Sequence, residues 1–131
     1  MVSLPVHHIG LITRHLERSL SVYMALGFEQ ETEIIADTVQ QNRIVFLGST
    51  APQTMRLELI EPMEGSSVAR LPDGWQHICF DALSIPDFEN WFSKQKIGKL
   101  YRRRVVAPAL GGRIVSFACL RDGSFVEFIH R

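Results

Sequence analysis

The sequence has little of what marks several large classes of protein. Its 131 residues include only two cysteines, Cys79 and Cys119, which is too few for a disulfide framework and is typical of free thiols in a reducing compartment. Neither charge is in excess, with 14 Lys and Arg against 14 Asp and Glu, and this balance argues against nucleic-acid or anionic-membrane partners. No apolar run approaches the roughly 18 residues of a membrane span. The first residues of the sequence also lack the pattern of a signal peptide, which is a basic region followed by a long apolar one. We therefore expect a cytoplasmic protein without a signal peptide.

The composition is that of a globular protein. Hydrophobic residues make up 46% of the chain and charged residues 21%, close to the average for folded domains. The length is enough for one domain with a buried core. We therefore predict a single domain over residues 1–131.

The pattern of apolar and polar residues indicates one unit used twice. In the first half, apolar runs and alternation predict strands at 5–12, 28–35, 43–48 and 54–61, a helix at 13–26 and a turn at 49–53. The second half repeats the pattern, with strands at 75–83, 100–106, 113–120 and 124–130 and a helix that begins at Ser84 and ends at Gly98. Module 1 thus covers about 5–62, a linker about 63–74, and module 2 about 75–131. Each half exposes an apolar sheet face that it cannot cover alone. We predict an α+β fold in which two tandem βαβββ modules form a curved eight-stranded sheet with helices outside, and expect the site on its concave face.

Four polar residues occupy matching places in the two halves. His8 and His77 each open an apolar strand, and Glu58 and Glu127 each follow their histidine by 50 residues (58 − 8 and 127 − 77) in the middle of another. Alternation turns the apolar neighbours toward the helices and these four side chains toward the concave face. Glu is rarely buried in a strand without a partner, and a divalent cation would remove the cost of burying it. Nitrogen and oxygen ligands without a thiolate suit Zn, Ni, Co, Mn or Fe(II).

Each of these four residues, considered separately, also has an explanation that does not involve a metal. A single strand histidine is more often structural than a ligand, and Glu58 could pair with Arg56. Repetition of the His–Glu pair favours a metal site with His8, Glu58, His77 and Glu127 as ligands. We expect Trp75 to line the cavity beside His77, and leave His7, His15 and His130, which lack symmetric counterparts, outside the site. The run 102–104 of three arginines either grips an anionic group of a substrate or is a solvated strand edge.

The order and spacing of several short motifs resemble the vicinal oxygen chelate superfamily, which includes glyoxalase I, methylmalonyl-CoA epimerase, extradiol dioxygenases and fosfomycin-resistance proteins. The resemblance spans essentially the whole chain and is carried by His8-Ile9-Gly10, Leu26-Gly27-Phe28, Glu58-Leu59-Ile60-Glu61-Pro62, His77-Ile78-Cys79-Phe80, and Asp122-Gly123 with Val126-Glu127-Phe128. It implies paired βαβββ modules around one divalent metal ion, whose ligand set falls on His8, Glu58, His77 and Glu127.

The same resemblance implies an activity. It is that of a metal-dependent isomerase, epimerase or lyase, methylmalonyl-CoA epimerase-like or lactoylglutathione lyase-like, that enolises a carbonyl substrate by proton abstraction. Glu127 is then the catalytic base, with Glu58 as a second candidate. The implied partners are a small molecule, such as an acyl-CoA or a thiol conjugate, and a second copy of the chain in a homodimer.

The sequence also departs from this family. Some epimerases carry an additional acidic base on the third strand, and here that strand reads Arg43-Ile44-Val45-Phe46-Leu47. A non-catalytic small-molecule binding or resistance protein of the same fold therefore stays open. A dioxygenase is a further alternative, although that class usually has two His and one carboxylate in a longer chain. The loops at 36–42, 62–74 and 107–112 carry no motif that identifies a substrate.

Overall fold

The computed structural model describes residues 3–51 and 55–130. Its elements, in chain order, are β1 (Val6–Ile12), α1 (Leu16–Ala25), β2 (Glu29–Gln30), β3 (Ile35–Asp37), β4 (Asn42–Gly48), β5 (Arg56–Pro62), β6 (Gly74–Asp81), α2 (Phe88–Gln95), β7 (Gly98–Ala107), the short 3-10 helix η1 (Pro108–Leu110), β8 (Arg113–Leu120) and β9 (Phe125–Ile129). The turn expected at 49–53 and the strand start expected at Thr54 fall partly on 52–54, which lie outside the described residues.

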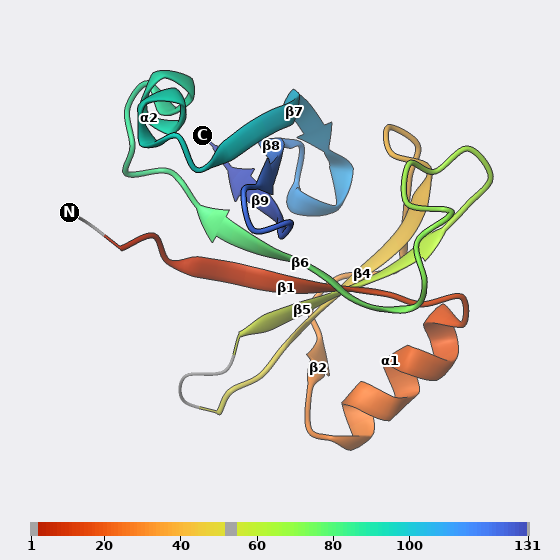
Figure 1. The fold of residues 1–131 in the computed structure, drawn as a ribbon. Helices are drawn as coiled ribbons and strands as arrows, with labels where there is room; N and C mark the ends of the chain where they lie inside the picture. Colours follow the sequence, from red (N-terminus) through yellow and green to blue (C-terminus); the bar gives the residue numbers. More distant parts are fainter. Residues whose placement is uncertain (1–2, 52–54, 131) are drawn as a thin grey trace.

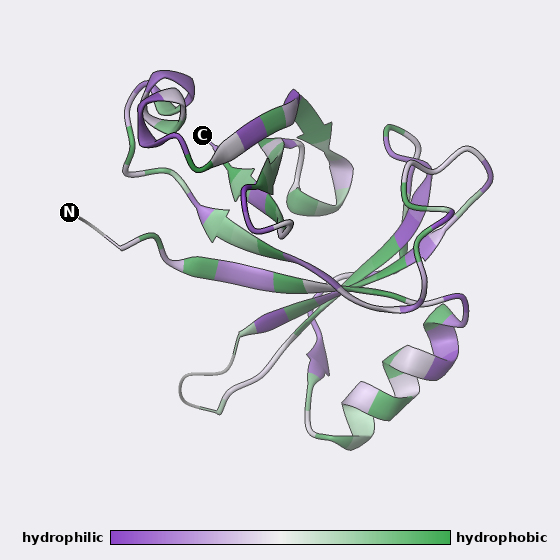
Figure 2. Ribbon diagram, viewed as in Figure 1, coloured by the Kyte–Doolittle hydropathy of each residue, from purple (hydrophilic) through white to green (hydrophobic). Residues whose placement is uncertain are grey.

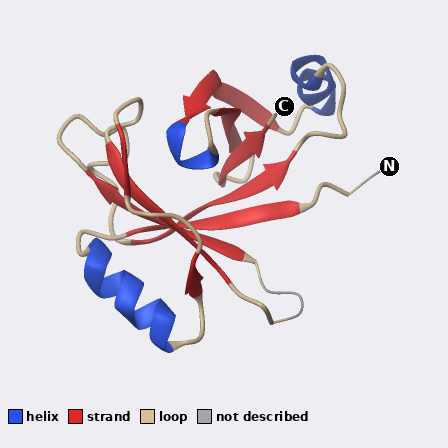
Figure 3. Ribbon diagram, turned by 180° about the vertical axis from the view of Figure 1, so that it is seen from behind, coloured by secondary structure: helices blue, strands red, loops and turns tan. Residues whose placement is uncertain are grey.

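All strands join one curved sheet, in the order β2-β4-β5-β1-β6-β9-β8-β7, with β3 also paired to β4. The two central strands, β1 and β6, are antiparallel, and they cross the middle of the molecule side by side (Figure 1). Each has a parallel neighbour on its outer side, β5 beside β1 and β9 beside β6. The two halves of the sheet curl toward each other, as the view from behind shows (Figure 3). The predicted α+β fold with paired modules is confirmed.

The sheet has nine strands instead of eight because two short strands replace the one expected at 28–35. β2 and β3 both pair with β4, and β3 continues to Asp37, into the loop expected at 36–42. Between them the Phe46 amide donates a hydrogen bond of 3.1 Å to Oγ1 of Thr32. A side-chain hydroxyl thus takes the place of a backbone acceptor, which interrupts the ladder. In the second half, β7 is a single strand of ten residues, although its register against β8 shifts on both sides of Arg102.

The helices cover the convex face of the sheet, one in each half (Figure 1). On α1, Leu16 is fully buried against Leu57 and Leu59 of β5. On α2, Phe88 and Phe92 pack against Phe128 of β9. Apolar and polar residues alternate along α1, and the strands it covers are largely hydrophobic (Figure 2). Because the leucines and Phe128 face the helices, the side chains between them on β5 and β9 face the concave side.

Both helices begin later than expected. The first turn of α1 starts at Leu16, whose amide donates a hydrogen bond of 2.9 Å to Oε2 of Glu61 on β5. A carboxylate from the sheet therefore serves as the acceptor at the N-terminus of the helix. Ser84 does not cap α2, because the backbone turns at Asp87 in the left-handed region (φ 49°) and the helix starts at Phe88. Within the described ranges, neither helix is long and apolar enough to cross a membrane.

Candidate metal centre

Four side chains from four strands meet at the centre of the concave face. The Nε2 atom of His8 lies 3.4 Å from Glu58 Oε1 and 3.0 Å from Glu127 Oε1. The Nε2 atom of His77 lies 3.3 Å and 3.2 Å from the same two oxygens, and the two Nε2 atoms are 3.2 Å apart. The structure therefore brings together the four residues that the sequence singles out. Arg56 is turned away and pairs with Glu31 at 3.0 Å, so the alternative in which it neutralises Glu58 is wrong.

The cluster is built across the junction of the two modules. In the β1–β5 pair Gly10 stands opposite Glu58, and in the β6–β9 pair Cys79 stands opposite Glu127. All four cluster residues are buried, with His8 completely inaccessible. Each half supplies one imidazole and one carboxylate, so neither half forms the site alone.

The cluster fits a divalent cation by its spacing. Ligand atoms held about 2.0–2.2 Å from one ion lie about 2.8–3.6 Å apart at tetrahedral to octahedral angles. The contacts between the imidazole nitrogens and the carboxylate oxygens, at 3.0–3.4 Å, fall in this range. Glu127 Oε1 is buried and, despite its short distances to both imidazoles, is not aligned for a hydrogen bond with either. Burying a carboxylate oxygen without a hydrogen bond costs folding free energy unless a cation interacts with that oxygen.

In the absence of metal, protons take over part of the cation's role. Burial on its own would lower the pKa of His77, but contacts with Glu127 and Glu58 outweigh it and raise that pKa to about 10. The pKa of His8 is also raised, because its attraction to the two carboxylates outweighs burial. Burial would raise the pKa of Glu127, and the two imidazoles lower it instead. A cation that binds here must displace protons from the histidines, so its affinity falls as the pH is lowered.

These shifts predict how the stability of the metal-free protein depends on pH. Because the pKa of His77 lies above its unfolded value of 6.5, its contribution is complete below pH 6.5 and is lost as the pH rises toward 10. The lowered pKa values of Glu58 and Glu127 act oppositely: their contributions are complete above pH 4.5 and are lost as the pH falls. In EDTA, the melting temperature of wild-type protein should therefore exceed that of His77→Gln by an amount that shrinks between pH 6.5 and 10. A difference that stays constant over this range would contradict the raised pKa.

Gly10 makes room for the ring of His77. A Cβ atom at this position would lie 2.1 Å from Cε1 and 2.4 Å from Nδ1 of His77, closer than atoms approach without displacement. The glycine of the His8-Ile9-Gly10 motif is therefore required by the side chain of the opposite strand rather than by a turn.

We expect Gly10→Ala to push the His77 ring out of the cluster. Overpacking of this kind costs about 1–3 kcal/mol of stability, and metal affinity should fall at least about tenfold because a displaced ligand acts as a weakened one. Urea denaturation and metal titration measure the two effects. In a His77→Ala background the same substitution should cost little, since the clashing ring is gone. An equal cost in both backgrounds would show that the clash lies elsewhere.

Two β-bulges change which side chains reach the site. Along β1, Val6 pairs with Phe80 and the next pair is His8 with Cys79, which leaves His7 as an extra residue. Along β6, His77 pairs with Gly10 and the next pair is Trp75 with Leu11, which leaves Gln76 as an extra residue.

The bulges correct two sequence-based expectations. Trp75 does not line the cavity: it is 61% exposed and contacts Tyr23 of α1 on the convex face. His7, expected outside the site, places Nδ1 2.8 Å from Nδ1 of His8. Burial, followed by the charge of His8, lowers the pKa of His7 to about 4. The sequence signal for His7 is its adjacency to His8. The prediction leaves it outside the site because module 2 has no histidine at the corresponding position, where Gln76 stands instead.

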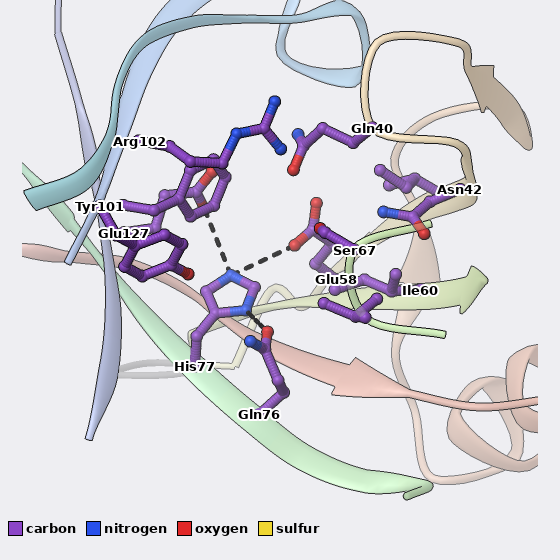
Figure 4. A pocket seen from close by; sticks show the side chains of 13 residues that line it. Gln40, Asn42, Glu58, Ile60, Ser67, Gln76, His77, Tyr101, Arg102 and Glu127 are labelled. Atoms are coloured by element: carbon purple, nitrogen blue, oxygen red, sulfur yellow. Dashed lines mark hydrogen bonds and ion pairs between the residues drawn. The ribbon is translucent and has the colours of Figure 1, made fainter. Parts of the chain in front are cut away.

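The cluster opens into a pocket with about 460 Å³ of empty space, part of it open to solvent. Tyr101 and Arg102 of β7 reach in from one side, and polar residues of module 1 and of the linker from the other (Figure 4). The latter are Gln40, Asn42 and Ser67. Ile44, Ile60 and Phe117 add apolar wall. The linker is fastened to module 1, since Ser66 Oγ lies 2.7 Å from Asn42 Oδ1.

The three consecutive arginines have different roles. Arg103 and Arg104 both contact Glu89 of α2, at 3.7 Å and 2.9 Å, as expected of a solvated edge. Arg102 lines the pocket instead, and no ion pair with a described acidic residue neutralises it. One cation of the run is thus available to a ligand.

Strand β4, which is the third strand of the sequence-based prediction, contributes no acid to the pocket. Arg43 points away from it, toward Glu61 at 2.6 Å and toward Glu17. On the pocket side of β4 stand Asn42 and Ile44. Among the described lining residues the carboxylates are Glu58 and Glu127 alone, so any carboxylate base must come from the cluster itself.

The chain is a curved sheet of paired modules around a buried His–Glu cluster that could hold a metal ion, and comparisons with known proteins identify its family. The model of the Glyoxalase/Bleomycin resistance protein/Dioxygenase superfamily matches residues 7–117. The chain belongs to this superfamily, within the vicinal oxygen chelate group. No curated protein matches the sequence significantly.

Several solved structures share the fold. A variant of methylmalonyl-CoA epimerase from Streptomyces coelicolor, in complex with 2-nitronate-propionyl-CoA, superposes with a TM-score of 0.77 at 23% identity and covers 98% of both chains. The methylmalonyl-CoA epimerase of Mycobacterium tuberculosis gives 0.80 at 16% identity, covering 99% of this chain and 92% of that one. A hypothetical protein from Bacillus halodurans gives 0.76 at 20% identity, covering 99% and 96%. Identities this low show the shared fold and leave the activity to be tested.

Proposed function

We propose that this protein is a divalent-metal-dependent enzyme that enolises a carbonyl substrate, as an epimerase or a glyoxalase-type isomerase or lyase does. The observation that carries the proposal is the buried cluster of two imidazoles and two carboxylates, with Glu127 Oε1 lacking a hydrogen bond. We assign His8, Glu58, His77 and Glu127 as the ligands of one ion, which is Zn, Ni, Co, Mn or Fe(II). We keep the division into modules at 5–62 and 75–131, joined by the linker 63–74, within one domain.

In this proposal each group at the site has a distinct chemical role. A bound divalent ion supplies Lewis-acid polarisation of a substrate carbonyl, which lowers the pKa of the adjacent C–H bond. Glu127 accepts the proton from that carbon and returns it, and Glu58 is the second candidate for this role. The low basicity of a carboxylate suffices because the C–H acidity is raised. The apolar wall of Ile44, Ile60 and Phe117 limits water around the reacting carbon.

The absence of a further acid among the described lining residues supports one-base chemistry. The same absence is also consistent with the alternative function, in which a protein of this fold binds a small molecule without turnover. The dioxygenase alternative has less support, because the second carboxylate, Glu58, meets the same two imidazoles as Glu127. Homodimer assembly and a cytoplasmic location stay predictions, and sedimentation velocity tests the first.

Deuterium uptake from D₂O tests the proposed function directly. We suggest two substrates, methylmalonyl-CoA and the hemithioacetal of methylglyoxal with glutathione, with mass spectrometry as the readout. Metal-loaded protein should exchange the carbon-bound proton of at least one of them, and chelation should stop the exchange. Protein that holds a full equivalent of metal but exchanges neither would contradict the proposal for both substrates. Binding of a substrate that is unchanged after chelation would favour the alternative without turnover.

Arg102 provides a prediction about substrate binding. Charge-assisted hydrogen bonds contribute about 1.5–3 kcal/mol, so Arg102→Gln should raise KM for an anionic substrate roughly 10–100-fold while kcat changes little. Arg103→Gln, which removes a neighbouring charge that contacts Glu89, is the matched control and should leave KM within about twofold. Similar values of KM for the two variants would show that Arg102 does not contact the substrate.

A further inference from the structure

The two bulges of the central strand pair occupy equivalent positions. His7 is the extra residue of β1 and Gln76 the extra residue of β6. Each immediately precedes a cluster histidine, and they are 69 residues apart (76 − 7), the same separation as His8 and His77. The two strands are thus irregular at the same point of each module, just before the residue that enters the site.

Each bulge produces the same contact. In a regular strand, neighbouring side chains point to opposite faces, and a bulge turns the extra residue so that this no longer holds. The Nδ1 atom of His8 is 2.8 Å from Nδ1 of His7, and the Nδ1 atom of His77 is 2.5 Å from Oε1 of Gln76. Figure 4 shows Gln76 beside His77, on the side of the ring away from the two carboxylates. In both histidines Nε2 faces the cluster.

The contacts are also chemically equivalent. An imidazole that gives its Nε2 lone pair to a metal carries its proton on Nδ1, and that N–H needs an acceptor. The side-chain oxygen of Gln76 is an acceptor for His77. For His8 the acceptor is the unprotonated Nδ1 of His7, whose own proton is then on Nε2. Phe46 bounds the His7–His8 pair, with its ring centroid 6.4 Å and 5.1 Å from those of the two histidines.

We propose that His7 and Gln76 are positioning residues, each delivered by a β-bulge, which hold His8 and His77 with the proton on Nδ1 and Nε2 directed at the metal. This inference rests on the proposed metal site and extends it from four residues to six. The two modules use different acceptors, an imidazole and an amide, at one structural position. Outer partners of metal-bound histidines change metal affinity about 10–100-fold when they are removed.

The test is a Co(II) titration of the whole chain, followed by its visible absorption spectrum, with thermal melting in EDTA as a separate measure of folding. His7→Leu and Gln76→Leu remove the acceptors at similar volume. Each should weaken Co(II) binding about 10–100-fold, while the melting temperature in EDTA changes by only a few degrees. His7→Gln and Gln76→Glu restore an acceptor and should bring the affinity back to within about threefold of wild type. The controls His15→Leu and Gln95→Leu alter exposed residues and should leave binding unchanged.

The outcomes separate the two proposals. If wild-type protein fails to bind Co(II), the proposed metal site is wrong, and the roles of His7 and Gln76 are wrong with it. If wild type binds but both leucine variants bind equally well, only the positioning role is overturned. A loss of affinity that parallels a loss of melting temperature in EDTA, and that the acceptor-restoring variants do not repair, would also overturn it in favour of a purely structural role.

Discussion

Glu127→Gln is expected to reduce deuterium exchange by about 10²–10⁴-fold, the usual contribution of a positioned general base. The amide keeps an oxygen at the position of Oε1, so the ion can remain bound, but it cannot accept a proton from carbon. Glu58→Gln is the matched control, because Glu58 has the same contacts to His8 and His77, at 3.4 Å and 3.3 Å. We expect it to lower exchange by less than about tenfold.

The metal content of each variant decides how this result is interpreted. Exchange and bound metal are measured on the same samples, so that loss of the ion is not mistaken for loss of the base. If Glu58→Gln abolishes exchange and Glu127→Gln does not, the base is Glu58. Full exchange by metal-loaded Glu127→Gln and Glu58→Gln alike would exclude both carboxylates as the base.

Loss of either cluster histidine should abolish the stabilisation that metal gives to the fold. At a metal concentration of 100 Kd, binding stabilises the native state by about 2.7 kcal/mol, which corresponds to a rise in melting temperature of roughly 10 °C for a domain of this size. His8→Ala and His77→Ala should each weaken binding by at least about 100-fold, since a lost ligand costs more than a lost outer partner. The rise on adding Zn, Ni, Co or Mn should then nearly vanish.

Comparison within each variant removes the main ambiguity of this experiment. Removing a buried imidazole beside two carboxylates also destabilises the metal-free protein, because it leaves their charges uncompensated. The informative quantity is therefore the difference in melting temperature with and without metal for the same protein. His15→Ala, at an exposed position, should keep the full wild-type difference. A histidine variant that also kept it would not have lost a ligand.

The order of elements followed from local patterns in the sequence. The periodicity of Leu57, Leu59, Val126 and Phe128 showed which faces of β5 and β9 are apolar, and therefore that Glu58 and Glu127 face the other way. The equal spacing of the two His–Glu pairs connected residues far apart in the chain. Side-chain alternation and internal repetition are both properties of the chain itself, so the sequence alone shows them.

Pairing between distant strands decided what the sequence left open. The bulges at His7 and Gln76 arise from the register of β1 against β6, strands about 70 residues apart, and a shift of one residue reverses the face of the side chains beyond it. For this reason Trp75 lies outside the pocket and His7 beside His8. Similarly, β7 changes register against β8 on both sides of Arg102, and in this irregular segment Arg102 faces the pocket while Arg103 and Arg104 contact Glu89. The four cluster residues were determined by the sequence, and the side chains that surround and orient them by the tertiary structure, because their positions depend on register and packing between segments distant in the chain.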